Sequence, residues 1–387
     1  MRKIAKYFKI SLSIALGVIA ILIIISTTYN HLGNCNIKGE IKGLGTRFAM
    51  ITGGSDSNNK TFLQIILIIN DRFNFKTHVK ESSSGRFITR NMLFKRASGK
   101  PLWMRSKIVE FRINPNETIS IIGSLKDHSI DYIISGNKLS EQSSKFKNDN
   151  LSILEYETYL MLTRDSLKYA GKDQKIIDSL NHLFDKTREE YNYQRLKYVI
   201  QNPTREISAT FLRSQSKDTI TKYFPILSKN VLETIDGKEL KERYGANLNL
   251  GIGKPAPMFS GLTIDSKPFN LSDLKGKYVV LDFWGTWCSW CIKGFPKMQA
   301  YYDRHKNELE FVGIACGDKK ETWGKFIKEK GLNWIQLLND EKNNDLAIKY
   351  GVVSYPTKVI IDKEGNIVEI YSGESDDFYN KLDELLK

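Results

Sequence analysis

The chain of 387 residues is too long for one ordinary hydrophobic core, and a prior of roughly 150 residues per domain suggests two or three units. With 41% hydrophobic and 11% aromatic residues, its composition excludes wholesale disorder. The net charge of +14 lies in the first 250 residues, since residues 251–387 carry 19 basic and 20 acidic side chains. No nucleic-acid-binding motif accompanies this excess, so a solvated basic surface near anionic lipid is favoured over a nucleic-acid partner.

The N-terminal segment has the charge pattern of a membrane anchor. Four cations precede a charge-free apolar run at residues 10–25, namely Arg2, Lys3, Lys6 and Lys9. Such a pattern keeps the N-terminus cytoplasmic and sends the following chain across the membrane. We expect residues 1–29 to tether the protein to the inner membrane, on the periplasmic side of the cell envelope.

Two other fates of this segment stay open. Cleavage after the stretch 26–28 would make it a signal peptide, although the apolar run of 16 residues is close to the roughly 20 residues of a full span and no A-x-A cleavage site follows. Lipid attachment at Cys35 is the second alternative, since residues 32–35 loosely resemble a lipobox. The simplest interpretation of Cys35 is an incidental residue in a linker.

Two regions follow that carry no catalytic constellation. Residues 36–136 form a β-rich domain, because apolar and alternating runs at 62–69, 107–113 and 118–123 are separated by Asn, Asp, Ser and Gly clusters. We expect a small antiparallel sheet there. Residues 139–249 show helical periodicity and form a helical connector, interrupted at Asn202-Pro203.

A redox motif stands in the last domain, which begins after the Gly- and Pro-rich linker 251–257. The apolar run 278–284 ends at a turn, and Cys288-Ser289-Trp290-Cys291 then opens a helical segment. A thiol at a helix N-terminus faces unpaired N–H groups and the positive end of the dipole, which stabilise the thiolate. Lowering a thiol pKa from about 8.5 to about 7 corresponds to roughly 2 kcal/mol. Cys291 lies within one turn of Cys288 and can attack a mixed disulfide, so the spacing predicts dithiol–disulfide exchange.

Other interpretations of the cysteines fit less well. Zinc needs four ligands, and only His305 and Cys316 stand near the motif in sequence. A structural disulfide of this spacing would close too small a loop to stabilise much. Cys316, after the predicted strand 310–315, is either a small buried hydrophobe or a third redox thiol. No metal or organic cofactor is expected.

The motif carries a family resemblance. Residues 282–291, Asp-Phe-Trp-Gly-Thr-Trp-Cys-Ser-Trp-Cys, resemble the active-site strand and turn of thioredoxins, and residues 353–357, Val-Ser-Tyr-Pro-Thr, resemble their cis-proline loop. The long gap between the two, together with segments 253–259 and 271–277, is similar to the membrane-tethered TlpA/ResA-like branch. The resemblance implies a thioredoxin fold over 251–387, an α/β/α sandwich with a central mixed sheet. Upstream, residues 37–41 and the helical stretch more weakly resemble the β-sandwich-plus-helices module of Bacteroidetes-type relatives, which implies no activity.

The resemblance also implies site residues. Cys288 would be the nucleophile and Cys291 the resolving thiol, the two forming the redox-active disulfide. Trp287, Tyr355 and Pro356 would bind the substrate, and Asp282, which matches the buried aspartate of plain thioredoxins, would accept a proton. The branch usually has a glutamate three residues after the second cysteine, where this chain has Gly294, so Asp282 is expected to serve alone.

The function predicted from the sequence is a reductase of protein disulfides outside the cytoplasm. Its expected partners are protein thiols and disulfides, with a membrane thiol-reductant as electron donor by resemblance. An oxidase or isomerase using the same residues is the nearest alternative, because the sequence does not fix the direction of electron flow. A binding module with vestigial cysteines is the alternative from another class. A peroxidase is disfavoured, since Thr286 stands two rather than three residues before Cys288 and no matching proline precedes it.

Overall fold

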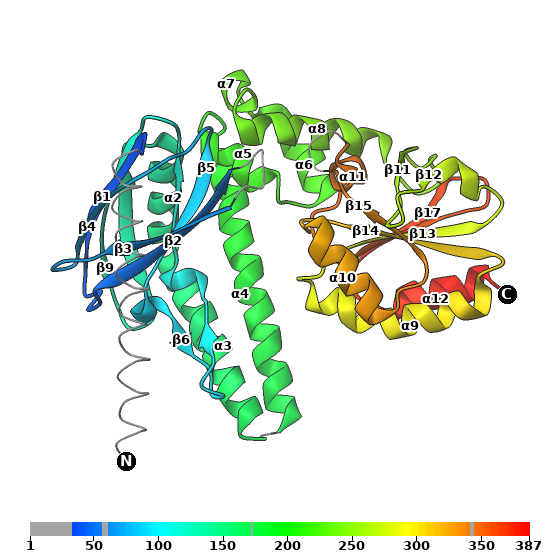
Figure 1. The fold of residues 1–387 in the computed structure, drawn as a ribbon, viewed down its shortest axis with the longest axis horizontal. Helices are drawn as coiled ribbons and strands as arrows, with labels where there is room; N and C mark the ends of the chain where they lie inside the picture. The colour runs from blue at the N-terminus through cyan, green and yellow to red at the C-terminus, as the bar shows by residue number, and fades with distance from the viewer. Residues whose placement is uncertain (1–32, 56–60, 172, 341–343) are drawn as a thin grey trace, which may run out of the picture. The chain divides into compact units, whose positions relative to one another are not determined.

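The computed structural model describes residues 33–55, 61–171, 173–340 and 344–387 (Figure 1). The predicted anchor, residues 1–29, lies outside them. Among the residues described, no helix is long and apolar enough to cross a membrane. The chain divides into two compact units, residues 1–201 with 205–207, and residues 202–204 with 208–387.

Two four-stranded sheets form the β-rich part of the first unit. Their strand orders are β10-β9-β1-β4 and β3-β2-β5-β8. The strands are β1 (Cys35–Lys42), β2 (Phe48–Ser55), β3 (Thr61–Leu67), β4 (Arg72–Thr77), β5 (Ser83–Ile88), β8 (Val109–Ile113), β9 (Thr118–Leu125) and β10 (Ile130–Ser135). A further short pair is β6 (Phe94–Lys95) and β7 (Pro101–Leu102). The expectation of an antiparallel sheet is wrong for β1 and β9, which pair in parallel because β9 returns beside β1 after the second sheet has been built.

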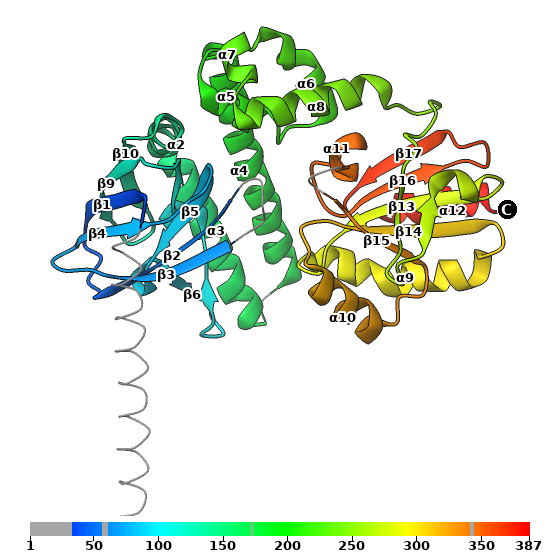
Figure 2. The same ribbon diagram turned by 45° about the horizontal axis from the view of Figure 1, so that its top comes forward.

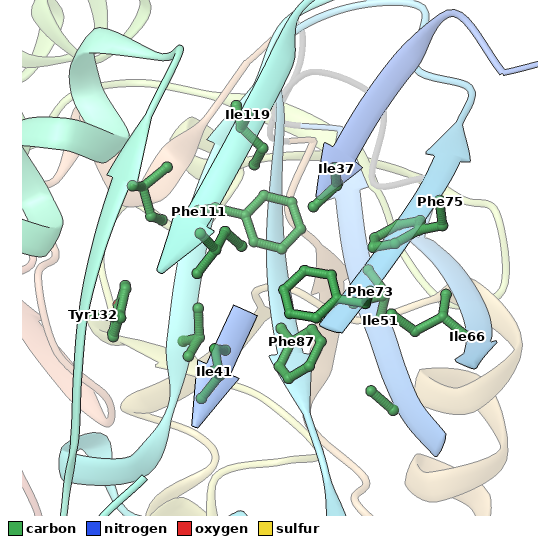
Figure 3. Close-up of a cluster of buried hydrophobic side chains, with 14 of the residues drawn as sticks. Ile37, Ile41, Ile51, Ile66, Phe73, Phe75, Phe87, Phe111, Ile119 and Tyr132 are labelled. Atoms are coloured by element: carbon green, nitrogen blue, oxygen red, sulfur yellow. The ribbon is translucent and has the colours of Figure 1, made fainter. Parts of the chain in front are cut away.

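The core of this unit lies between the two sheets. Side chains alternate between buried and exposed along β4 and along most of β5, as strands covered on one face require. The buried side chains of the two sheets point toward one another (Figure 3). Phe73 of β4 and Phe87 of β5 meet there with ring centroids 4.7 Å apart. The β-rich region is therefore a sandwich of two sheets.

Cys35 belongs to this core. It is the first residue of β1 and is 2% exposed, and its Sγ lies 3.1 Å from the carbonyl oxygen of Asn114. Burial raises the pKa of its thiol. The interpretation of Cys35 as an incidental linker residue is therefore wrong, because it begins a strand and packs inside the sandwich.

Helices connect the sandwich to the last domain. The first unit contains α2 (Lys138–Asp149), α3 (Leu151–Tyr169) and α4 (Gln174–Gln201). The helix α4 ends two residues before Pro203, since the residue preceding a proline avoids the helical conformation. The second unit contains α6 (Lys217–Tyr223), α7 (Lys229–Leu232), α8 (Ile235–Asn249) and α5 (Glu206–Leu212) from residue 208 onward. The helices of the predicted connector are thus divided between the two units.

A five-stranded mixed sheet organises the rest of the second unit. Its order is β15-β14-β13-β16-β17, and the strands lie side by side in this order in Figure 2. They are β13 (Tyr278–Trp284), β14 (Leu309–Ala315), β15 (Ile335–Leu338), β16 (Thr357–Ile361) and β17 (Ile367–Ser372). The first three run parallel, and β16 runs antiparallel to β13 and β17. This arrangement confirms the α/β fold expected for residues 251–387.

The two faces of the sheet carry separate cores. Helices α9 (Ser289–His305), α10 (Lys320–Lys330) and α12 (Asp376–Leu385) cover one face, where Phe295, Trp323 and Phe378 are buried. The hairpin of β11 (Ser260–Leu262) and β12 (Pro268–Asn270) and the short helix α11 (Leu346–Lys349) cover the other. Because side chains alternate along β13, Val280, Asp282 and Trp284 face the first core, which also holds the paired cysteines.

Candidate active site

The redox pair lies where β13 passes into α9. Buried along nearly its whole length, β13 brings the chain to the turn at Gly285, and Cys288 then forms the N-cap of α9. Its Sγ accepts a hydrogen bond of 3.2 Å from the backbone N–H of Cys291. Cys288 and Cys291 form a disulfide with an S–S distance of 2.02 Å. Cys288 therefore stands at the positive end of a 17-residue helix, where a thiolate is stabilised.

Two exposed tryptophans flank this disulfide. Cys288 is 6% and Cys291 2% exposed, whereas Trp287 and Trp290 are 56% and 63% exposed. The indole Nε1 of Trp287 donates a hydrogen bond of 3.0 Å to the carbonyl oxygen of Cys316 and so fixes the ring. Two large exposed aromatic side chains therefore stand next in sequence to Cys288 or between the two cysteines.

The cis-proline loop lies against the same aromatic surface. The Tyr355–Pro356 peptide bond is cis, as the resemblance implied. The ring of Tyr355 packs edge-on against Trp287, with ring centroids 5.2 Å apart. Because Thr357 begins β16 opposite Phe283 of β13, the loop and the cysteines lie at the same end of these two strands. The structure thus brings Cys288, Trp287, Tyr355 and Pro356 together.

Asp318, which the sequence analysis did not single out, holds the turn before the cysteines. Its carboxylate accepts hydrogen bonds from the backbone N–H of Thr286 at 2.8 Å and from the Thr286 hydroxyl at 2.5 Å. The Thr286 hydroxyl is therefore engaged away from the disulfide. A carboxylate just after the strand that neighbours β13 was the available sequence signal.

Cys316 follows β14 but packs on the other face of the sheet. It is 1% exposed and lies in the core that includes Phe283, whereas Cys288 and Cys291 belong to the opposite core. This position fits a small buried hydrophobe and gives no support to a third redox thiol. Within the parts of the chain that the structure describes, no three His, Cys, Asp or Glu side chains are grouped to hold a metal ion.

On the sheet face that carries the cysteines, Asp282 is part of a buried ionic group. Its side chain is 1% exposed, and its Oδ1 lies 3.5 Å from the Nζ of Lys358, which is equally buried. Lys358 stands directly opposite Asp282 on β16. Burial raises the pKa of Asp282, the ammonium group of Lys358 opposes this rise, and Glu374 adds to it.

Glu374 and Tyr379 complete what we call the inner cluster, namely Asp282, Lys358, Glu374 and Tyr379. The Oε2 of Glu374 lies 2.7 Å from the Nζ of Lys358, and its Oε1 accepts a hydrogen bond of 2.8 Å from the Tyr379 hydroxyl. Desolvation and the nearby carboxylate of Glu374 raise the pKa of Tyr379, which keeps its hydroxyl protonated. A second carboxylate, Glu374, therefore lies in the same buried group as Asp282, and the expectation that Asp282 serves alone as proton acceptor stays a prediction.

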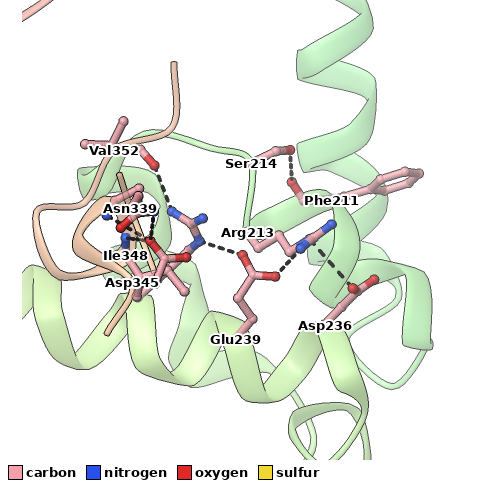
Figure 4. A network of polar contacts seen from close by, with 11 residues as sticks. Phe211, Arg213, Ser214, Asp236, Glu239, Asn339, Asp345, Ile348 and Val352 are labelled. Atoms are coloured by element: carbon pink, nitrogen blue, oxygen red, sulfur yellow. Dashed lines mark hydrogen bonds and ion pairs between the residues drawn. The ribbon is translucent and has the colours of Figure 1, made fainter. Parts of the chain in front are cut away.

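A second ionic group, which we call the connector network, reaches the cis-proline loop from α8. It consists of Arg243 together with Arg213, Asp236 and Glu239, the last three of which are labelled in Figure 4. The Nε of Arg243 lies 3.0 Å from Glu239, and its Nη1 donates a hydrogen bond of 2.8 Å to the carbonyl oxygen of Val352. Because Val352 stands three residues before Tyr355, a helix outside the thioredoxin fold holds the start of this loop.

The C-terminal domain is similar to several known proteins. The model of the AhpC/TSA family matches residues 252–370. The thiol-disulfide oxidoreductase ResA of Bacillus thuringiensis subsp. konkukian is 34% identical over 137 residues, which cover 35% of this chain and 77% of that protein. ResA of Bacillus subtilis is 37% identical over 122 residues, which cover 31% of this chain and 67% of the relative. The solved thioredoxin domain of a thiol-disulfide oxidoreductase from Bacteroides vulgatus is 32% identical and matches 36% of this chain and 99% of its own, with a TM-score of 0.34. Through its C-terminal domain, with a redox pair at the start of α9, the chain belongs to the ResA-like thiol-disulfide oxidoreductases.

Proposed function

We propose that this protein reduces disulfides of other proteins outside the cytoplasm, with Cys288 attacking and Cys291 resolving. The observation that carries the proposal is the position of Cys288, which caps α9 beside the exposed ring of Trp287. Tyr355 packs on that ring, so Trp287, Tyr355 and Pro356 form a surface on which an extended polypeptide can rest next to the sulfur atom. A protein disulfide is a substrate of the right size for such an open, aromatic site.

Replacing one cysteine or the other is expected to give different trapped species. Cys291→Ser leaves an attacking thiol with no resolving partner, so it is expected to accumulate a mixed disulfide with substrate protein. Cys288→Ser is expected to accumulate none, because Cys291 is 2% exposed and lies inside the first turn of α9. Non-reducing gels and mass spectrometry of the trapped species measure this difference. The matched control is Cys316→Ser, and trapping by Cys288→Ser alone would reverse the assignment.

The reduction potential of the cysteine pair indicates the direction of electron flow. A reduction potential near about −270 mV suits a reductase, whereas one near about −120 mV suits an oxidase. Equilibration of the full-length protein with glutathione buffers gives the potential of the Cys288–Cys291 pair. A strongly oxidising value would favour the oxidase alternative.

The proposed location is the periplasmic side of the inner membrane, with residues 1–29 as an uncleaved anchor and a membrane thiol-reductant as electron donor. The four N-terminal cations and the absence of an A-x-A site in the sequence support it. Carbonate washing of membranes and N-terminal sequencing test it, and a released protein beginning near Tyr29 would make the segment a signal peptide. Lipid attachment at Cys35 ranks last, since its sulfur atom packs in the sandwich core.

A further inference from the structure

The helix position one turn after Cys291 has no side chain, and a carboxylate from elsewhere fills its place. A Cβ atom added at Gly294 would lie 2.5 Å from the Oε2 of Glu374 and 2.6 Å from its Cδ. Residues three apart on a helix share a face, so this position neighbours Cys291. The carboxyl group of Glu374 therefore lies against α9 on the same face as the resolving cysteine.

Glu374 is held in this place from several sides. It stands between the end of β17 and the N-cap of α12, after a turn at Gly373 with φ of 86°. The N–H of Gly373 donates a hydrogen bond of 2.8 Å to the carbonyl oxygen of Pro356, which ties this turn to the cis-proline loop. Lys358 binds one carboxylate oxygen and the Tyr379 hydroxyl binds the other. The carboxylate is thus fixed pointing inward.

Lys358 joins the two carboxylates of the inner cluster, which differ in their access to water. Its Nζ lies 2.7 Å from Glu374 and 3.5 Å from Asp282. Asp282 is 1% exposed, whereas the side chain of Glu374 is 18% exposed. A proton taken up inside this cluster therefore meets solvent on the Glu374 side.

We propose that Glu374 is a functional carboxylate of the reaction, which carries the proton of Cys291 from the inner cluster to solvent and replaces a carboxylate on α9 that Gly294 cannot provide. This inference rests on the proposed function, because it assigns a role in the resolution step. Asp282 and Glu374 then work as a pair joined by Lys358, instead of Asp282 acting alone.

In the resolution step, one disulfide bond is exchanged for another. Cys288 is joined to the substrate by a mixed disulfide, and the S–H bond of Cys291 breaks as its proton passes to the carboxylate pair. The sulfur atom of Cys291 forms a bond to that of Cys288, and the bond between Cys288 and the substrate sulfur breaks with its electron pair. The departing substrate thiolate is protonated from water, and the carboxylate pair releases its proton to water.

The groups that face Glu374 come from three elements. They are Asp282 from β13, Lys358 from β16 and Tyr379 from α12. Beyond them, Lys297 of α9 lies 4.0 Å from the centre of the Tyr379 ring and pairs with Asp376 at 2.6 Å. Since the raised pKa of Tyr379 keeps its hydroxyl protonated, this group is not expected to accept the proton of Cys291.

Single-turnover kinetics of the full-length protein test the proposal. The reduced protein is mixed in a stopped-flow instrument with the aromatic disulfide dithiobis(nitrobenzoate), from pH 6 to 9. Attack by Cys288 releases one coloured thiol, and resolution by Cys291 releases a second. Glu374→Gln is expected to slow the second phase by roughly 10²-fold at each pH, as loss of a group that accepts a proton does. The first phase is expected to change less than about two-fold, because it needs no proton from Cys291.

Two further variants separate a chemical role from a structural one. Glu374→Ala combined with Gly294→Glu moves the carboxylate onto α9 and is expected to recover most of the second-phase rate, because the alanine vacates the space that a side chain at 294 needs. Asp376→Asn removes an outward carboxylate two residues away, whose side chain is 87% exposed, and is expected to leave both phases unchanged. Rates for Glu374→Gln equal to those of the parent at every pH would overturn the proposal, as would failure of the transplanted carboxylate to restore the rate. Absence of the first phase in the parent protein would instead contradict the proposed function.

Discussion

The inner cluster and the connector network are both ionic groups that support the active site, yet one ion pair of the first is further removed from water than one of the second. Asp282 and Lys358 of the inner cluster are 1% exposed, whereas the side chains of Arg243 and Glu239 are 14% and 26% exposed. Each group also spans both environments, since the side chain of Glu374 is 18% exposed and that of Asp236 is 3% exposed. The first group lies on the sheet face of the cysteines, and the second holds the chain before the cis-proline. Charges removed from water interact more strongly and have perturbed proton affinities, whereas charges near the surface contribute mainly geometry. We therefore expect the inner cluster to govern stability and proton transfer, and the connector network to govern substrate binding.

The largest expected effect follows from removing the cation of the inner cluster. Lys358→Met leaves two carboxylates, Asp282 and Glu374, without their ammonium partner, and breaking a buried ion pair in this way costs about 3–5 kcal/mol. Urea unfolding of the oxidised protein at pH 7 measures the change. The control is Lys297→Met, which breaks the exposed pair with Asp376 and is expected to cost less than about 1 kcal/mol. Equal losses in the two variants would remove the distinction between buried and exposed pairs.

The second effect concerns the resolution rate. Asp282→Asn is expected to slow the attack of Cys291 on the mixed disulfide by roughly 10²-fold, while the attack of Cys288 changes little. Gly294→Glu is not expected to rescue this variant, because Glu374 already fills the space beside position 294. Stopped-flow rates from pH 6 to 9 measure both steps. Resolution as fast as in the parent throughout this range would make Asp282 a structural residue.

The active-site motifs and the inner cluster could be predicted from the sequence to very different extents. The cysteines and Asp282 lie in one continuous segment, 282–291, and the cis-proline lies in another, so local motifs were enough to find them. Lys358, Glu374 and Tyr379 come from β16, a turn and α12, and only the antiparallel pairing of β16 with β13 brings Lys358 opposite Asp282. One signal was available, since Lys358 stands in the buried strand Thr357–Ile361, where a lysine needs a partner.

In the β-rich region, the sequence likewise indicated single strands but not how they pair. The strands at 62–69 and 118–123 were visible as β-branched or alternating runs, and the structure has β3 and β9 there. The parallel pairing of β1 with β9 could not be predicted, because it depends on which strand returns to the sheet after a long excursion. The connector network could not be predicted either, because it depends on a contact between residues far apart in the chain. Arg243 and Val352 are separated by 109 residues.

A third effect is the pH dependence of stability. Burial raises the pKa of Asp282 above its ordinary value, so the folded protein resists ionisation of this group. The resulting stability is fully present below the unfolded pKa, about 4, and is lost as the pH rises through the folded value. The side chain of Asp282→Asn cannot ionise, so the variant does not lose this stability. Its free energy of unfolding is therefore expected to rise relative to that of the parent as the pH rises. Urea unfolding of both oxidised proteins from pH 4 to 8 measures the difference, and parallel curves would contradict the raised pKa.

The smallest expected effect tests the connector network. Arg243→Met removes the hydrogen bond to the carbonyl oxygen of Val352 and the ion pair with Glu239. Because these groups are partly exposed, we expect a loss of about 1 kcal/mol of stability. Looser placement of the loop before Tyr355 is expected to raise the KM for a protein disulfide about three-fold, which corresponds to roughly 0.7 kcal/mol, while the resolution rate stays unchanged.

The matched control for Arg243 is Arg213→Met. Arg213 pairs with Asp236 and Glu239 in the same network, but the hydrogen bond to Val352 comes from Arg243. Arg213→Met is therefore expected to lower stability by a similar amount and to leave the KM unchanged. Turnover with a protein disulfide at several concentrations, measured beside urea unfolding, separates the two quantities. If both variants raise the KM equally, the network acts on the loop through general stability, and the hydrogen bond from Arg243 has no special part in holding the substrate surface.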